Sequence, residues 1–129
     1  MSQIEIIPKG SNKRLSTNIM ANEADCQCVN ISCEHTLYCP ELLEKFELLR
    51  ESCGNKPIYI TSAFRCHSHN KWVGGVAKSS HKIAMALDLV LPLDMSMNEF
   101  VNKCREHFHL AIPYRAERFV HCSISTWRE

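Results

Sequence analysis

Residues 60–90 read ITSAFRCHSHNKWVGGVAKSSHKIAMALDLV, and this stretch predicts the centre of the fold. It begins in a run rich in β-branched residues, which is typical of a strand, and passes through two adjacent glycines. It ends in an apolar segment, 86–91, that we expect to form a buried strand containing Asp88. A charged residue in so apolar a strand needs a partner, because burying an unpaired charge is costly.

Two histidines are candidates for that partner. His81 lies in the loop before the strand, and His121 lies in a second short β-like run, FVHCSI. Two imidazoles and one carboxylate make a ligand set suited to a catalytic zinc, with a fourth position left for water. Taken alone, a His and an Asp seven residues apart would indicate nothing, so the surrounding motif decides the interpretation.

The rest of the chain predicts one α+β domain. Pro40 opens a helix in which Leu42, Leu43, Phe46 and Leu49 recur at helical spacing, and Gly54 with Asn55 ends it. Residues 67–72 predict a short helix, and a capping box of Ser96 and Glu99 starts a helix over 97–107. Strands are expected at 109–112 and 119–125. Residues 1–14 are expected to be an irregular arm, and 15–129 the domain.

Composition excludes several classes of protein. The 129 residues carry a formal charge of +1 and no run of Lys or Arg, so we expect no nucleic-acid partner. The N-terminus lacks the apolar stretch of a signal peptide, and no segment approaches a membrane span. We therefore expect the protein to stay in a cytoplasm, or to leave it by a route other than its own signal.

Eight cysteines are many for this length, and without a signal peptide a disulfide framework is not the first interpretation. Four of them, with His35 among them, lie close together in sequence: Cys26, Cys28, Cys33 and Cys39. They could hold a structural zinc or be buried thiols, and their spacing matches no standard zinc finger. The other four are predicted to be small core residues: Cys53, Cys66, Cys104 and Cys122.

The stretch 60–90 resembles the core of the zinc D-alanyl-D-alanine peptidase family, whose members typically read I-T-S-G-Y-R-x-x-x-H-N-x-x-V-G-G-x-x-x-S-x-H-x-x-G-x-A-x-D. The upstream segments LSTNIMANEADCQC and CPELLEKFELLRE resemble the short domains of this family in phage lysins and virion proteins. FVHCSI is similar to the family's terminal strand with the third ligand. The residues that fall in register are Thr61, Ser62, Arg65, His69, Asn70, Val73, Gly74, Gly75, Ser79, His81, Ala86 and Asp88.

The resemblance implies an antiparallel sheet flanked by helices, shared with the signalling domain of hedgehog proteins. It implies zinc held by His81, Asp88 and His121, and substrate contacts by Arg65 and by Ser79 or Ser80. Arg65 would polarise the scissile carbonyl or hold a carboxylate. The implied substrates are peptides of bacterial peptidoglycan, often with D-alanine at the cleaved bond. A phage or prophage setting is implied, in the host cytoplasm or the virion, with other virion proteins as further partners.

The chain departs from the family pattern at the general base. Many members have an acid three residues before the last histidine, where this chain has Arg118, and the nearest acid is Glu117. Others have an aspartate two residues after that histidine, where this chain has Ser123, as in hedgehog domains. We therefore expect a zinc peptidase with Glu117 as the base. The alternative is an inactive, zinc-stabilised binding or structural module of the same fold.

Overall fold

The computed structural model describes residues 3–125, and a four-stranded antiparallel sheet lies at their centre. Its order is β5 (Ile60–Ser62), β6 (Ala86–Val90), β8 (Phe119–Ser123) and β7 (Leu110–Tyr114). Two further pairs of strands belong to the N-terminal part: β1 (Glu5–Pro8) with β4 (His35–Tyr38), and β2 (Arg14–Ser16) with β3 (Ile19–Met20). The predicted α+β fold is confirmed.

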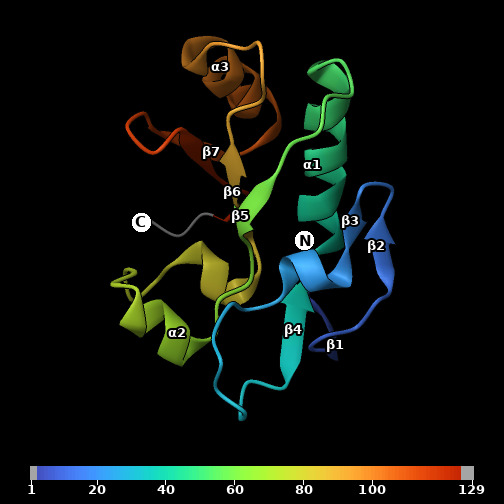
Figure 1. Cartoon of the computed structure of the whole chain (residues 1–129), viewed down its shortest axis with the longest axis vertical. Helices are drawn as coiled ribbons and strands as arrows, with labels where there is room; N and C mark the ends of the chain where they lie inside the picture. Colours follow the sequence, from blue (N-terminus) through green and yellow to red (C-terminus); the bar gives the residue numbers. More distant parts are fainter. Residues whose placement is uncertain (1–2, 126–129) are drawn as a thin grey trace.

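Two helices, α1 (Pro40–Ser52) and α3 (Met97–His107), supply much of the core. α1 runs alongside the sheet, and α3 lies next to its β7 edge (Figure 1). The apolar side chains that they bury pack with Leu87 and Leu89 of β6 and with Val120 and Cys122 of β8. Successive residues of a strand point to opposite faces, so the neighbours of these four residues, Asp88 and His121 included, face away from this core.

Local sequence accounts for both helices. α1 begins with Pro40, and its buried residues Leu42, Leu43, Phe46 and Leu49 recur on one face. It ends before Gly54 and Asn55, which both have positive φ angles (76° and 59°) that suit glycine and asparagine. α3 begins after Ser96, whose hydroxyl accepts a hydrogen bond from the Glu99 amide at 3.1 Å.

Two short elements lie in the connection between β5 and β6. α2 (His67–Trp72) follows β5, and a single 3-10 turn, η2 (Ser80–Ile83), precedes β6. Another 3-10 turn, η1 (Ala21–Ala24), directly follows β3. Among the described residues, no helix combines the length and apolar character that crossing a membrane requires.

The prediction of an irregular arm over residues 1–14 is wrong in one respect. Residues 5–8 form β1, because Ile6 and Ile7 pair with Leu37 and Thr36 of β4. The hairpin of β2 and β3 is fixed to α1 by Glu47, whose carboxylate accepts hydrogen bonds from the Ser16 hydroxyl at 2.6 Å and the Asn18 amide at 2.7 Å. A strand formed by pairing with a segment 30 residues away leaves no strong local signal. Residues 126–129 of the predicted domain lie outside the described part of the chain.

Candidate metal centre

The register of the central sheet brings Asp88 and His121 together. Asp88 of β6 lies directly opposite His121 of β8, and residues opposite each other in an antiparallel pair project from the same face. Oδ1 of Asp88 is 3.0 Å from Nδ1 of His121. Both residues are buried, with 9% and 8% of their surface exposed. The face that carries them is the one opposite the helical core.

The 3-10 turn η2 places His81 beside this pair. The Ser79 hydroxyl caps the turn by accepting a hydrogen bond from the His81 amide at 3.3 Å. The turn ends at Ala84 in a left-handed conformation (φ 58°), which is where the family pattern has glycine. Nε2 of His81 then lies 3.1 Å from Asp88 Oδ1.

The donor set fits a metal ion. Nδ1 of His81 donates a hydrogen bond to the Ala63 carbonyl at 2.6 Å, so Nε2 is the ring nitrogen that faces Asp88. The ligand atoms of His81, Asp88 and His121 all lie within 4.8 Å of one another. Ligands on a tetrahedral zinc are about 3.4 Å apart, so little movement would be needed.

The carboxylate of Asp88 is held in its charged form. Burial would raise its pKa, but hydrogen bonds from His121 and His81 outweigh that effect and bring the pKa to about 2. Its second oxygen, Oδ2, lies 3.8 Å from a guanidinium nitrogen of Arg65. An anionic carboxylate with two imidazoles is the ionisation state that a divalent cation requires.

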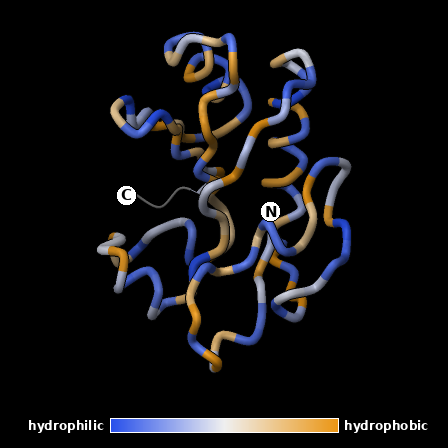
Figure 2. The backbone as a smooth tube through the Cα atoms, viewed as in Figure 1, coloured by the Kyte–Doolittle hydropathy of each residue, from blue (hydrophilic) through white to orange (hydrophobic). Residues whose placement is uncertain are grey.

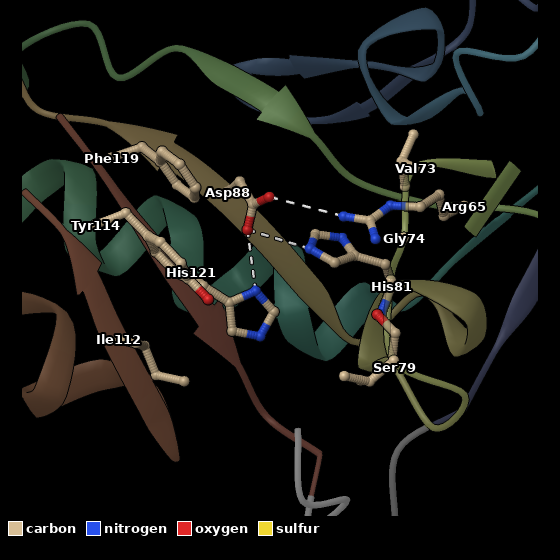
Figure 3. Close-up of a pocket in the computed structure, with 12 residues that line it drawn as sticks. Arg65, Val73, Gly74, Ser79, His81, Asp88, Ile112, Tyr114, Phe119 and His121 are labelled. Atoms are coloured by element: carbon tan, nitrogen blue, oxygen red, sulfur yellow. Dashed lines mark hydrogen bonds and ion pairs between the residues drawn. The ribbon is translucent and has the colours of Figure 1, made fainter. Parts of the chain in front are cut away.

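These groups lie in the wall of an open cavity of about 400 Å³. In Figure 3, His81, Asp88 and His121 point toward one another, with Arg65 on one side and the aromatic pair of Tyr114 and Phe119 on the other. The two aromatic rings stack with centroids 4.7 Å apart. The other lining residues are Val73, Gly74, Gly75, Val76, Ser79 and Ile112. A volume of this size accommodates a short stretch of peptide.

The guanidinium of Arg65 is positioned by neighbours rather than left mobile. It donates to Oδ1 of Asn70 at 3.0 Å and to the Ser62 hydroxyl at 3.4 Å. Asn70 is itself buried and donates to the Val76 carbonyl at 2.9 Å, which ties α2 to the loop that follows it. Arg65 therefore presents a fixed positive charge at the cavity wall.

The other predicted site residues lie in different surroundings. Ser79 lines the cavity, whereas Ser80 is fully buried and does not belong to the lining. Any contact between Ser80 and a substrate would require its surroundings to move. Glu117 is exposed in the turn between β7 and β8 and does not line the cavity. Within residues 3–125, the lining contains one carboxylate, that of Asp88.

The cysteines gather differently from the sequence prediction. Cys26, Cys28 and Cys33 do come together, but the fourth member is Cys66, from the start of α2. Cys39 instead precedes α1 and is fully buried in the main core, and His35 is exposed in β4. The expectation that Cys66 is a core residue is therefore wrong. The cause is long-range: at least 33 residues separate Cys66 from the other three, beyond the reach of a spacing rule.

The aromatic pair and the Ala63 carbonyl were not predicted from the sequence. Tyr114 and Phe119 flank the β7–β8 turn and pair across it, so an aromatic residue on each side of a predicted turn was a usable signal. The Ala63 carbonyl had no such signal, since every residue carries one.

The fold and the site define an α+β domain with a metal-ligand set in the wall of an open cavity. The chain belongs to the Peptidase M15 family, whose model matches residues 13–123. That match covers the sheet, the three helices and all three candidate ligands, and it supports a peptidase. A comparison with curated proteins finds no match to this chain.

Proposed function

We propose that this protein is a zinc-dependent peptidase that hydrolyses peptidoglycan peptides, at stem or cross-link bonds containing D-alanine. The observation that carries the proposal is the convergence of His81, Asp88 and His121 beside Arg65 in the cavity wall. These three residues would hold the zinc. Bound there, zinc would supply Lewis acidity, which acidifies water and polarises a carbonyl.

The remaining groups act on the substrate. Arg65, held by Asn70, would pair with a peptide carboxylate or with the negative charge that develops on the scissile carbonyl oxygen. Ser79 would contact the bound peptide, whereas the fully buried Ser80 would reach it only after a movement of its surroundings. The stacked rings of Tyr114 and Phe119 would exclude water from one side of the bound chain.

Proton transfer is assigned to Glu117. It is the acid nearest in sequence to the position where many relatives have theirs, and it lies in the turn that leads into β8 and His121. Its carboxylate would have to turn toward the cavity when substrate is bound. We also propose a phage or prophage setting, in lysis or on the virion, because the segments upstream of residue 52 resemble such domains.

A second candidate is a zinc-stabilised binding module without activity. The single carboxylate in the described lining favours it, as do Arg118 and Ser123 at the positions where relatives have acids.

The test measures zinc content and release of peptides from purified cell walls by wild type, His81→Ala, Glu117→Ala and the exposed-acid control Glu44→Ala. Cleavage by wild type and Glu44→Ala alone would support the peptidase with Glu117 as its base. Cleavage that survives in Glu117→Ala would place the base elsewhere. Zinc binding without cleavage by wild type would favour the binding module.

A further inference from the structure

A second group of potential metal ligands lies outside the site described above. The sulfur atoms of Cys26, Cys28, Cys33 and Cys66 all lie within 4.8 Å of one another. Three of these residues come from the irregular loop between η1 and β4, and the fourth starts α2. Four mutually close sulfurs are what a tetrahedral metal site needs, whereas a disulfide uses only two.

The spacing of the sulfurs matches a metal site better than a disulfide. The sulfurs of Cys66 and Cys28 are 3.9 Å apart, and all eight cysteines of the chain are free. Zinc–sulfur bonds of about 2.3 Å in a tetrahedron separate neighbouring sulfurs by about 3.8 Å. A disulfide would require about 2.05 Å.

The surroundings of the cluster are arranged to stabilise negative charge on sulfur. Backbone amides point at it: Cys66 N lies 3.3 Å from Cys26 Sγ, and His69 N lies 3.4 Å from Cys66 Sγ. The ammonium of Lys9 lies 3.6 Å from Cys28 Sγ and also donates to the Cys28 carbonyl. Four thiolates around one divalent cation leave a net charge of −2, which these donors and Lys9 offset in part.

Hydrophobic burial does not account for the position of the cysteine loop. Its two large apolar residues, Val29 and Ile31, are 98% and 92% exposed, and Figure 2 shows hydrophobic residues at the tip of the loop. The core beneath the loop is small, with Cys26, Phe64 and Ala84 as its buried members. A metal is a usual means of ordering a segment with so little core.

We propose that Cys26, Cys28, Cys33 and Cys66 bind a second, structural zinc ion, distinct from the ion proposed at His81, Asp88 and His121. The site would join the cysteine loop to the start of α2. Cys66 directly follows Arg65, and α2 carries the Asn70 that holds the Arg65 guanidinium. The second ion would therefore help to position Arg65 from outside the reacting centre.

The test counts metal ions per chain in the full-length protein after purification in zinc-containing medium. We expect two in wild type, one in Cys33→Ala, one in His81→Ala and two in the matched control Cys39→Ala. Cys39 has the same residue type and lies six residues further along, in the main core. These variants test the two sites separately. Loss of metal only in His81→Ala would overturn the cysteine site, and loss of metal only in Cys33→Ala would overturn the site at His81, Asp88 and His121.

Two further measurements keep the proposal falsifiable if Cys33→Ala does not fold. Cobalt(II) added to metal-free His81→Ala should give the near-ultraviolet charge-transfer absorption of thiolate-bound cobalt, and its absence would overturn the proposal. Alkylation of the denatured wild type without reductant should modify all eight cysteines. Protection of four of them would show two disulfides in place of the metal.

Discussion

The close approach of Gly75 to Asn70 gives a sharp test of how Arg65 is held. A Cβ atom on residue 75 would lie 2.2 Å from Asn70 Oδ1 and 2.9 Å from an Arg65 guanidinium nitrogen. Real Cβ atoms essentially never lie within 3.0 Å of such a neighbouring atom. Gly75→Ala must therefore move the Asn70 oxygen by 3.0 − 2.2, or about 0.8 Å.

That displacement is large compared with the hydrogen bond it disturbs. Along the bond, a shift of about 0.8 Å would stretch the 3.0 Å contact between Asn70 and Arg65 to about 3.8 Å, which is no longer a hydrogen bond. Asn70 is 3% exposed, so it has little room to yield, and overpacking of this kind costs about 1–3 kcal/mol. Misplacing a substrate-positioning group by about 1 Å can cost roughly 10²-fold in rate.

The assay is kcat/KM for peptide release, together with thermal unfolding, for wild type, Gly75→Ala and the control Gly54→Ala. Gly54 follows α1 at φ 76° with no atom within 4 Å of its added Cβ, so alanine there strains the backbone without a clash. We expect Gly54→Ala to lose about 1–2 kcal/mol of stability with kcat/KM unchanged. Gly75→Ala should lose about 10²-fold in kcat/KM while folded. Equal kcat/KM for the two variants would refute the idea that Asn70 holds Arg65 rigidly.

Three further predictions concern stability and metal. Glu47→Gln should lower the free energy of unfolding by about 1 kcal/mol at neutral pH. Burial alone would raise the pKa of Glu47, but hydrogen bonds from Ser16 and Asn18 outweigh that effect and lower the pKa below 4.5. The variant should therefore differ most from wild type in free energy of unfolding above pH 4.5, and the difference should shrink as the pH falls through the lower pKa of the folded state. A difference that does not change with pH would contradict an origin in the ionised Glu47 carboxylate. Ser96→Ala should cost about 1 kcal/mol in urea unfolding by removing the cap on α3, whereas an unchanged midpoint would show that the cap contributes nothing. A chelator should abolish peptide release, zinc should restore it, and release that persists after metal removal would count against the metal centre.

Local signals determined much of this protein. Pro40 and the apolar spacing that follows predict α1, and the Ser96 cap predicts the start of α3. The apolar run around Asp88 predicts β6. Each of these signals acts within a few residues along the chain, where turn geometry, side-chain periodicity and capping decide the backbone conformation. The motif around His81 also allowed the candidate ligands to be named before their geometry was known.

Only the tertiary structure decided how distant groups meet. The register of β6 on β8 places His121 opposite Asp88, since a slip by one residue would turn His121 toward the helical core. Chain topology brings Cys66 to Cys26, Cys28 and Cys33, and leaves Cys39 in the main core. Contacts across 30 or more residues depend on how all the elements pack at once, which no local pattern specifies. For that reason, residues 60–90 and the run FVHCSI predicted the three candidate metal ligands, whereas the membership of Cys66 in the cysteine cluster emerged only from the folded chain.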